Sequence, residues 1–325
     1  MAMAIRIHQT GGPEEFKWEE VQVGDPGPGE VRLEQSVVGL NYIDVYHRTG
    51  LYPLPAMPAI IGLEAAGRVT AIGDGVTEVG VGDRVAYAGV PPGAYATERL
   101  IPAHRLIKMP DSISDRTAGA MMLQGMTAQY LLRRTAQVGE GDWILVHAAA
   151  GGVGLMLCQW ARHLGARVIG TAGSPEKAAL AKENGCDFPI LYRTENFVDR
   201  VAEFTDGEKC KVVYDAIGKD TFEDSLASLA PMGMMVSYGN ASGSVPPLDI
   251  ARLGALGSLF ITRPSLMTYT AKRDDLVASA TDLIDVVSKG IVKIEVNQEY
   301  ALKDAAQAHR NLEARKTTGS TVLIP

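Results

Sequence analysis

Residues 143–172 read WILVHAAAGGVGLMLCQWARHLGARVIGTA, and this stretch decides the fold of the chain. It predicts a short apolar strand over 143–148, a glycine-containing turn, a helix over 151–165 that stops at Gly165, and a second strand over 167–172. Apolar strands that alternate with helices are typical of a mostly parallel sheet with helices on both faces. The segment therefore predicts the start of a doubly wound α/β domain.

The pattern continues to about residue 264 and then changes. A helix that begins with Pro175 follows, and further strands are predicted at 190–192, 211–216, 234–239 and 258–263. The regions on either side have a different style. The region before it has strand candidates at 31–40, 65–73 and 82–89, which glycine and proline residues separate. The region after it predicts helices at 271–288 and 304–315, and strands at 291–296 and at the end of the chain. We expect the two ends to form one discontinuous domain around the inserted α/β unit.

Bulk composition excludes several classes of protein. The chain has 325 residues, a formal net charge of −7 and no lysine- or arginine-rich run, which argues against a general nucleic-acid or anionic-membrane binder. The 3 cysteines, Cys158, Cys186 and Cys210, form no CxxC pair, as expected in a reducing compartment. We see no signal peptide and no uncharged stretch long enough to span a bilayer, so we expect a cytoplasmic protein.

The turn Ala149-Ala150-Gly151-Gly152-Val153-Gly154 lies between the first strand and its helix. Glycines at such a turn let the backbone approach a pyrophosphate, and the free N–H groups of the helix N-terminus receive its charge. The alternative is a tight strand–helix turn without a ligand. Because a strand precedes the turn and a helix and a second strand follow it, we favour dinucleotide binding.

The end of the second strand indicates which dinucleotide. NAD-binding domains carry an aspartate or glutamate here, which accepts hydrogen bonds from the adenosine ribose and repels a 2′-phosphate. This chain has Gly173 and Ser174 instead, with Lys177 one helical turn later and Tyr192 at the end of the third strand. These residues offer space, hydroxyl donors and a cation to a phosphate, so the sequence predicts NADPH. In the alternative, Lys177 is only a solvated helix residue.

Residues 141–162, GDWILVHAAAGGVGLMLCQWAR, carry a more specific pattern than the glycine turn alone. They resemble the quinone oxidoreductase/zeta-crystallin signature at Gly141, Asp142, Leu145, Ala149, Ala150, Gly151, Gly152, Gly154, Gln159 and Arg162. The chain as a whole resembles the medium-chain dehydrogenases/reductases. This resemblance implies an α/β fold with a GroES-like β-rich catalytic domain, residues 1–124 and 265–325, and a Rossmann NADP-binding domain with a doubly wound parallel sheet, residues 125–264.

The segment GLEAAGRVTAIGDGV, 62–76, is similar to the zinc-alcohol-dehydrogenase pattern but departs from it. That pattern has a zinc-binding histidine after its first glycine, and this chain has Leu63. The four-cysteine lobe of the zinc enzymes is missing too, since residues 1–157 contain no cysteine. None of the histidines has a metal-ligand spacing, so we expect no zinc and assign core or surface packing to His8, His47, His104, His147, His163 and His309.

The resemblance implies candidates for the chemistry. The segment NYIDVYHRTGLY, 41–52, resembles the part of family members that lines the nicotinamide end and the substrate cleft. Its candidates are Asn41, Asp44, Tyr46 and Tyr52, and Arg263 at the end of the strand predicted at 258–263 is a further one. Each tyrosine could stack on a quinone or donate to its oxygen, or it could simply pack. Asp44 could orient its neighbours, and Arg263 could attract the acceptor or form a structural salt bridge.

Other positions resemble family contacts to the cofactor. They lie around residue 42, on the helix near 127, on the glycine turn, after the strands of the parallel sheet and in the last helix. The set comprises Asn41, Tyr42, Thr127, Tyr130, Gly151, Gly152, Val153, Gly173, Ser174, Lys177, Tyr192, Ile217, Tyr238, Gly239, Asn240, Pro264, Ser265 and Arg315.

Three functions remain open at this point. The first is an NADPH-dependent reductase of small-molecule quinones, since hydride transfer to a delocalised acceptor needs positioning and modest hydrogen bonding but no metal. The second is an NADPH-dependent reductase of enals or enones, and the third is a non-catalytic NADPH-binding regulator. The strand 258–263 also resembles the edge through which family members pair their sheets, so we expect a homodimer.

Overall fold

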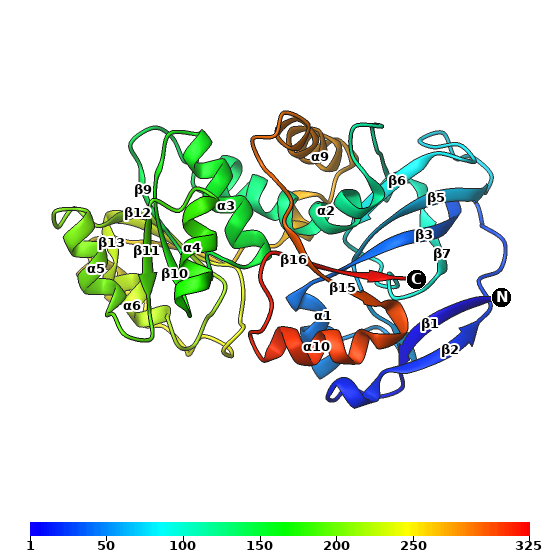
Figure 1. Ribbon diagram of the computed structural model, residues 1–325, viewed down its shortest axis with the longest axis horizontal. Coiled ribbons are helices and arrows are strands. Elements are labelled where there is room, and N and C mark those ends of the chain that lie inside the picture. Colours follow the sequence, from blue (N-terminus) through cyan, green and yellow to red (C-terminus); the bar gives the residue numbers. More distant parts are fainter. The chain divides into compact units, whose positions relative to one another are not determined.

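The computed structural model describes residues 1–325 and divides into two compact units. Unit 1 comprises Met1–Met126, Tyr269–Ser288 and Ile294–Pro325, and unit 2 comprises Thr127–Thr268 and Lys289–Lys293. The chain can be followed through both units by label and colour in Figure 1.

Unit 1 is rich in strands. Its strands are β1 (Ala2–Ile7), β2 (Lys17–Val21), β3 (Glu30–Leu40), β4 (Ala59–Ile60), β5 (Glu64–Ile72), β6 (Arg84–Ala88), β7 (Glu98–Pro102), β8 (Ile107–Lys108), β15 (Val296–Ala301) and β16 (Ser320–Ile324). Its helices are α1 (Tyr42–Thr49), α9 (Arg273–Ser288), α10 (Ala305–Glu313) and the part of α2 (Asp115–Tyr130) up to Met126, with 3-10 turns at Pro13–Glu15, Ala103–Arg105 and Leu302–Asp304.

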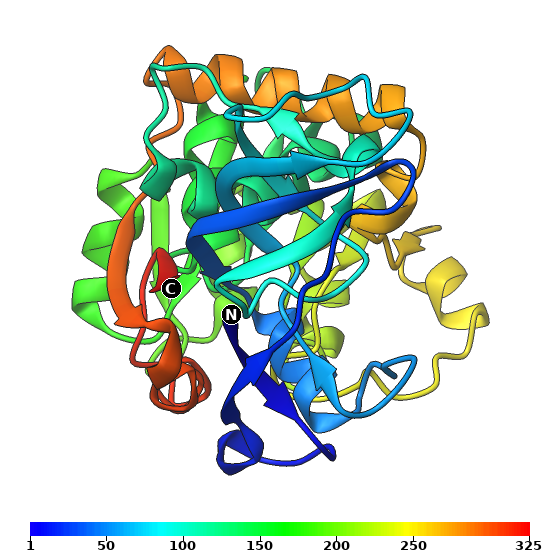
Figure 2. The same ribbon diagram turned by 90° about the vertical axis from the view of Figure 1, so that its right-hand side faces the viewer.

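The strands of unit 1 form a 7-stranded and a 3-stranded sheet. The larger sheet has the order β15-β16-β3-β5-β6-β8, with β7 also paired to β3, and the smaller one has the order β2-β1-β4. The β1–β2 hairpin is dark blue in Figure 2, where α9 appears in orange. Along β3 buried and less buried residues alternate at first and then become continuously buried, because one sheet face packs on a core that includes Leu33, Ile61 and Tyr95.

Unit 2 alternates strands and helices. Its strands are β9 (Trp143–Val146), β10 (Arg167–Ala172), β11 (Phe188–Leu191), β12 (Cys210–Asp215), β13 (Leu229–Ser237) and β14 (Phe260–Thr262). Its helices are the end of α2 with a π-helical turn at Leu131–Thr135, then α3 (Gly152–His163), α4 (Pro175–Glu183), α5 (Phe197–Phe204), α6 (Phe222–Ala227), α7 (Ala251–Ala255) and α8 (Leu266–Tyr269).

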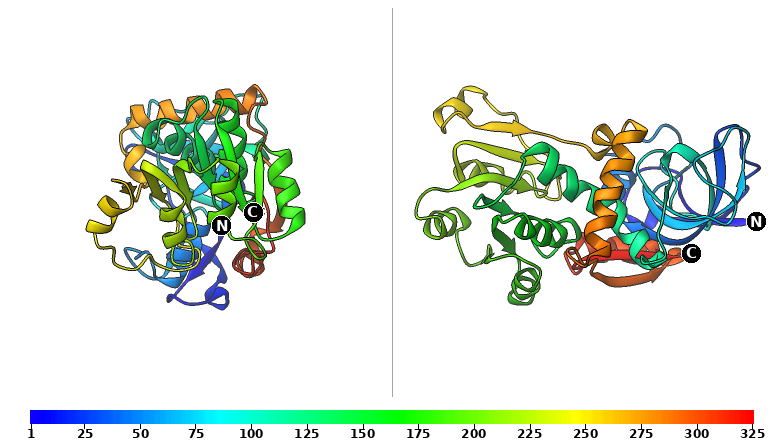
Figure 3. Two further views of the ribbon diagram at one scale, coloured as in Figure 1. Left: turned by 90° about the vertical axis from the view of Figure 1, so that its left-hand side faces the viewer. Right: turned by 90° about the horizontal axis from the view of Figure 1, so that it is seen from above.

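All pairs in the 6-stranded sheet of unit 2 are parallel, in the order β11-β10-β9-β12-β13-β14. The direction in which successive strands are added to the sheet reverses beside β9, as in Rossmann domains. Ligands of such sheets bind beyond the carboxyl ends of the strands. The strands are apolar because helices cover them, and β9 is buried at each of its 4 residues. The strands can be traced in green to gold in Figure 3. The predicted fold class is confirmed.

Two helices near the predicted site begin with recognisable caps. Ser174 caps α4 by accepting a hydrogen bond from the backbone N of Lys177, and Pro175 occupies the first helical turn. The backbone N of Asn41 donates to Asp44 Oδ2 at the start of α1, and Gly50 ends that helix with a φ of 82°. Helix α1 was not foreseen, although its capping residues and Gly50 were readable signals.

The strand predicted at 291–296 is wrong. The strand is β15, and it begins only at Val296. The preceding backbone is held by a side chain, because Gln159 Oε1 accepts from the N–H of Lys293 and Gln159 Nε2 donates to its carbonyl oxygen. These bonds satisfy the backbone of Lys293 without a neighbouring strand, an arrangement between distant residues that sequence spacing does not reveal.

None of the helices combines the length and the apolar character that crossing a bilayer requires.

Candidate cofactor and substrate sites

The glycine turn after β9 has the geometry of an anion-binding helix start. Gly151 is the N-cap of α3, and a Cβ on Gly154 would lie 2.3 Å from the carbonyl oxygen of Ala148. Only glycine fits at position 154, because the helix packs directly on the turn. The first N–H groups of α3 have no partner within the helix, so they remain able to hold a negatively charged group such as a pyrophosphate.

The ends of β10 and β11 bring together the residues predicted to read a phosphate. A Cβ on Gly173 would lie 2.9 Å from the Tyr192 hydroxyl, so glycine leaves room for that hydroxyl. Ser174 lies next in the chain, and Lys177 is in the first turn of α4. This set of hydroxyl groups and one ammonium fits a 2′-phosphate.

Glu176 is an acidic member of the same turn that the sequence reading did not weigh. A hydrogen bond from the Ser174 side chain lowers the pKa of this fully exposed carboxyl group. Glu176 therefore carries a negative charge at neutral pH next to the predicted phosphate pocket. Its repulsion is weakened by water and salt because the group is exposed.

The loops after β12 and β13 are joined by hydrogen bonds. Asp215 Oδ1 accepts from the backbone N of Ile217 (2.7 Å) and of Gly218 (3.0 Å), and the carbonyl oxygen of Asp215 accepts from the N of Tyr238. Gly239 packs on this loop so closely that a Cβ would lie 2.4 Å from the Ala216 carbonyl oxygen. Both loops lie at the carboxyl edge of the sheet, where cofactor contacts were predicted.

Arg263 follows β14 and ties that strand to the preceding loop. Its Nη1 donates to the carbonyl oxygen of Ser237 (2.7 Å), and Nη2 donates to the amide oxygen of Asn240 (3.1 Å) in the amide orientation that satisfies both groups. Arg263 thus makes hydrogen bonds to neutral acceptors, and Pro264 and Ser265 follow it in the chain.

Thr127 and Tyr130 lie in the last turn of α2 and are buried in the structure, with 7% and 3% of their surface exposed.

In unit 1, helix α1 and the turn that follows it carry a cluster of three tyrosines, Tyr42, Tyr46 and Tyr52. The ring centroids of Tyr42 and Tyr46 are 5.4 Å apart, and those of Tyr46 and Tyr52 are 5.1 Å apart. Tyr46 is buried, whereas Tyr42 and Tyr52 are half-buried. The predicted tyrosines therefore form one group of tilted rings, the arrangement that aromatic side chains prefer when they pack.

Asn41 is fixed by residues from three other elements. Its Nδ2 donates to Glu64 Oε2 (2.6 Å), and its Oδ1 accepts from Gln124 Nε2 (3.0 Å). The second Glu64 oxygen accepts from the N of Leu123, and Gln124 Oε1 accepts from Ser320. Burial raises the pKa of Glu64 to about 7, against hydrogen bonds that lower it. This set holds the Asn41 amide in one orientation.

Asp44 is the start of a second buried chain. Asp44 Oδ2 accepts from the Tyr95 hydroxyl (3.1 Å), which also contacts His309 Nε2 (2.9 Å). His309 Nδ1 lies 3.1 Å from Arg48 Nη1, and Arg48 forms a two-bond ion pair with Glu313. Because arginine only donates, His309 Nδ1 accepts and Nε2 carries the proton that it donates to the Tyr95 oxygen. The Tyr95 hydroxyl in turn donates its hydrogen bond to Asp44.

Burial dominates the electrostatics of this chain. It raises the pKa of Asp44 to about 7 and, together with the charge of Arg48, lowers the pKa of His309 to about 3. The other oxygen of Asp44, Oδ1, has no hydrogen-bond partner. Asp44 is therefore a completely buried carboxyl group poised between its charged and neutral forms near neutral pH.

Tyr42 and Arg315 meet at the far end of this chain. Burial and the charge of Glu313 raise the pKa of Tyr42, while Arg315 and Arg48 lower it. Helix α10 ends at Glu313, so Arg315 lies two residues beyond it and not in the last helix as predicted, and its φ is 57°. The tyrosine predicted from the first segment and the arginine predicted from the last helix are thus electrostatic neighbours within unit 1.

The side chains do not fit a zinc ion. Leu63, where the zinc pattern has a ligand, is buried and apolar, and the structure has no group of 3 or more His, Cys, Asp or Glu side chains suited to a metal. Cys158, Cys186 and Cys210 are free and buried.

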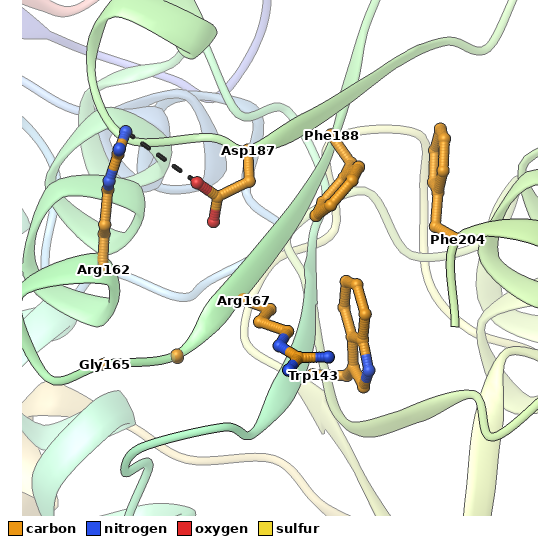
Figure 4. Close-up of a pocket in the computed structure, with 8 residues that line it drawn as sticks. Trp143, Arg162, Gly165, Arg167, Asp187, Phe188 and Phe204 are labelled. Carbon is orange, nitrogen blue, oxygen red and sulfur yellow. Dashed lines mark ion pairs between the residues drawn. The ribbon is translucent and has the colours of Figure 1, made fainter. Parts of the chain in front are cut away.

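A surface hollow of unit 2 lies beside the amino ends of β9, β10 and β11, at the edge of the sheet opposite to the predicted cofactor contacts. Trp143, Phe188 and Phe204 gather on one of its sides, and Arg167 lies over the Trp143 ring at 5.1 Å (Figure 4). Arg162 forms an ion pair with Asp187 there. The aromatic residues also belong to the core of unit 2, so packing accounts for them.

Several residues of these networks were not singled out from the sequence as parts of the site. They are Glu64, Tyr95, Gln124, His309 and Ser320 in unit 1 and Asp215, Ser225, His147 and Thr171 in unit 2, the last four being joined by side-chain hydrogen bonds. Histidines 147 and 309 were assigned to packing, and their burial agrees with that. The hydrogen-bond partners of these two histidines lie 24 to 261 positions away in the sequence, so local spacing offered no signal.

The comparisons with known proteins agree with this architecture. Residues 27–111 match the family model described as "Alcohol dehydrogenase GroES-like domain", and residues 152–282 match the one described as "Zinc-binding dehydrogenase". A GroES-like domain joined to a parallel-sheet nucleotide domain defines the class of medium-chain dehydrogenases/reductases.

Relatives within that class narrow the assignment. The chain is 50% identical over 325 residues to "Quinone oxidoreductase" of Pseudomonas aeruginosa, with 100% of both chains covered. It is 47% identical to "2-haloacrylate reductase" of a Burkholderia species, with 100% of this chain and 99% of the relative covered. A crystal structure of Escherichia coli quinone oxidoreductase complexed with NADPH matches with a TM-score of 0.98 and 44% identity, covering 99% of this chain and 100% of that one. The chain belongs to the quinone oxidoreductase family.

Proposed function

We propose that this protein is an NADPH-dependent reductase of quinones that works without a metal ion. The observation that carries the proposal is the carboxyl edge of the parallel sheet. There the free N–H groups at the start of α3 lie after β9, and Gly173, Ser174 and the Tyr192 hydroxyl lie after β10 and β11. Full-length similarity to quinone oxidoreductases supports the same activity.

Residues of unit 2 would hold the cofactor. The N–H groups of the turn bind the pyrophosphate. Lys177, Tyr192 and Ser174 bind the 2′-phosphate, for which the Ser174 hydroxyl turns from Glu176 to the phosphate. The remaining proposed contacts are Thr127, Tyr130, Ile217, Tyr238, Gly239, Asn240, Pro264 and Ser265. From unit 1 we propose Asn41, Tyr42 and Arg315.

When bound, NADPH supplies a hydride, and a quinone becomes a hydroquinone by taking up that hydride and one proton. The quinone delocalises the charge it receives, so the protein needs to position the acceptor rather than supply a strong acid. Tyr46 and Tyr52 offer ring faces and hydroxyl donors, and the Asn41 amide is held in place by Glu64 and Gln124. We propose that Asp44 orients α1 and that Arg263 fixes the loop of Asn240.

A second candidate is the reduction of activated alkenes such as enals and enones. It is favoured by the similarity to a protein named 2-haloacrylate reductase. The same hydride would go to the β-carbon, and a proton would go to the α-carbon. A tyrosine hydroxyl of the α1 cluster would then serve as the donor.

The deciding experiment follows the loss of NADPH absorbance after treatment of the protein with a chelator. A 1,4-benzoquinone, a straight-chain 2-enal and 2-chloroacrylate are compared as acceptors, with NADH in parallel. Fast turnover with the quinone and NADPH supports the proposal. Preference for an alkene replaces the substrate, and binding of NADPH without turnover of any acceptor would leave a regulatory protein.

We further propose that unit 1 carries the catalytic domain and unit 2 the NADP-binding domain, in a cytoplasmic homodimer joined through residues 258–263. Strand β14 ends the parallel sheet, and Phe260 and Ile261 are 57% and 40% exposed. An apolar sheet edge of this kind is a site for pairing with another strand.

Sedimentation tests the dimer. We expect Ile261→Lys to shift the protein toward the monomer, whereas Val277→Lys, at a similarly exposed position of α9, leaves the mass unchanged. A monodisperse wild-type monomer would contradict the proposal.

A further inference from the structure

A continuous chain of polar groups lies buried beneath the carboxyl edge of the parallel sheet. The backbone N of Ala148 lies 3.3 Å from Thr171 Oγ1, which lies 3.0 Å from His147 Nδ1. His147 Nε2 lies 3.0 Å from Ser225 Oγ, and Ser225 Oγ donates to Asp215 Oδ2 at 2.9 Å. We call these five residues the His147 chain.

Chemistry fixes the position of each proton along the His147 chain. The Asp215 carboxylate only accepts, so the single hydroxyl proton of Ser225 forms the hydrogen bond to Asp215. Ser225 Oγ must therefore accept the hydrogen bond from His147 Nε2–H. In the neutral ring, Nδ1 is then the acceptor of a hydrogen bond that the Thr171 hydroxyl donates. Thr171 in turn accepts from the Ala148 N–H. Every donor in the chain therefore has an acceptor, and the order of donation runs one way.

The alternative, a charged imidazolium, is opposed by its surroundings. His147 is 1% exposed, and burial lowers its pKa even though Asp215 and Asp224 act in the opposite direction. Thr171, Ser225 and Asp215 are equally buried, with exposures of 2%, 0% and 0%. A buried chain in which every group is satisfied resists rearrangement, because breaking one bond leaves two polar groups without partners.

The His147 chain joins three strand ends that carry proposed cofactor contacts. Ala148 belongs to the turn after β9 and has a φ of 52°, which is unusual for a residue with a side chain. Thr171 lies two residues before Gly173 at the end of β10. Asp215 ends β12, and its other oxygen holds the N–H groups of Ile217 and Gly218.

We propose that His147 is a positioning residue for the cofactor, which fixes the glycine turn, the end of β10 and the 215–218 loop in one geometry ready for NADPH. The inference rests on the proposed function. It adds a residue that holds three cofactor-binding segments together, which none of the proposed binding residues does. His147 touches no ligand in this proposal. It acts by joining Thr171 on one side to Ser225 on the other.

The test measures the dissociation constant for NADPH by titrating the protein and recording the fluorescence of the cofactor. Thr171→Val removes the hydroxyl while keeping the shape of the side chain, and we expect NADPH affinity to fall roughly 5- to 30-fold. Thr171→Ser keeps the hydroxyl and should bind within about twofold of wild type. Thr205→Val is the matched control, because Thr205 is a buried threonine of unit 2 whose hydroxyl bonds Val201 and Lys209 instead.

A role in stability alone would give a different pattern. The valine variants at 171 and 205 would then lower the melting temperature alike and leave the dissociation constant for NADPH unchanged. If Thr171→Val binds NADPH as wild type does, the positioning role is overturned, whatever its stability.

Ser225→Ala supplies an independent arm, since Ser225 lies on the other side of the imidazole from the glycine turn. We expect it to weaken NADPH binding too, and the double variant T171V/S225A to lose less affinity than the product of the single losses. Losses that multiply would mean that His147 does not couple the two sides. Wild-type protein that fails to bind NADPH would overturn the proposed function and this inference together, whereas wild-type binding with unaffected variants overturns only the inference.

Discussion

The two buried polar networks of this protein differ in how completely their carboxyl groups are satisfied. In unit 2, Asp215 accepts from two backbone N–H groups and from the hydroxyl groups of Thr221 and Ser225, so both of its oxygens are used. In unit 1, Asp44 Oδ2 accepts two hydrogen bonds, whereas Asp44 Oδ1 has none.

The difference between Asp215 and Asp44 indicates that the two networks have different roles. A saturated carboxylate holds loops rigidly, which suits an edge that must present N–H groups to a ligand. Asp44 has no partner for Oδ1, and burial raises its pKa to about 7. Burial also raises the pKa of Glu64 to about 7, although both of its oxygens accept hydrogen bonds. We therefore expect unit 2 to respond mainly to changes of shape and unit 1 to respond to pH.

The largest loss of NADPH affinity is expected at Gly154, where the close packing of α3 on the glycine turn leaves no room for a side chain. Gly154→Val places a side chain 2.3 Å from the Ala148 carbonyl oxygen and must push α3 away from the turn. We expect NADPH affinity to fall roughly 100-fold or more, measured by fluorescence titration. Gly139→Ala is the control, because a Cβ there meets nothing within 4 Å. Unchanged affinity in the valine variant would show that the turn does not approach the cofactor.

The pH response of unit 1 is tested with Asp44→Asn. The pKa of Asp44 is raised from 3.8 to about 7, so the folded protein retains a proton that the unfolded chain releases between these values. The stabilisation is complete below about pH 4 and is lost as the pH rises through 7. Relative to the variant, the wild-type free energy of unfolding should fall by up to about 1.4 kcal/mol per pH unit in that window.

Denaturant unfolding at a series of pH values measures this difference. Asp111→Asn, which removes a fully exposed carboxyl group of the same unit, serves as the control for the substitution itself. A flat difference for Asp44→Asn would show that the buried carboxyl group does not titrate in this range.

Charge at the end of β10 should have an intermediate effect on cofactor choice. Lys177→Ala removes the ammonium proposed to meet the 2′-phosphate, and NADPH affinity should fall by about 10- to 100-fold while NADH affinity stays the same. Titrations with both dinucleotides measure the ratio. Equal losses for NADPH and NADH would show that Lys177 does not recognise the phosphate.

The smallest effect is expected for Glu176→Gln in the same turn. Removing this exposed negative charge should tighten NADPH binding by about two- to fivefold at low salt, and the gain should shrink as salt is added. Lys182→Gln, a charge change at the other end of α4, is the control. Weaker NADPH binding in the Glu176 variant would contradict the repulsion.

The sequence predicted most of unit 2 correctly because its signals are local. Apolar strands, the glycines of the turn, Pro175 at a helix start and Gly185 at its end each lie within a few residues of the structure that they specify. Prediction failed where a distant side chain intervened, as when Gln159 took the backbone bonds of Lys293 and displaced the expected strand. Residues 41 and 44 were singled out as candidates, but their partners Glu64, Gln124, Tyr95 and His309 were not.

The sequence by itself determined the class of fold, the place of the glycine turn before α3 and the absence of an acidic residue at positions 173 and 174. Those properties follow from the order of neighbouring residues along the chain. Only the tertiary structure decided which polar groups meet in the core, the direction of every hydrogen bond in the His147 chain and the burial that raises the pKa of Asp44. The physical reason is that desolvation and hydrogen bonding depend on what surrounds a group in space, and the groups that surround Asp44 and His147 come from strands and helices far apart in the sequence.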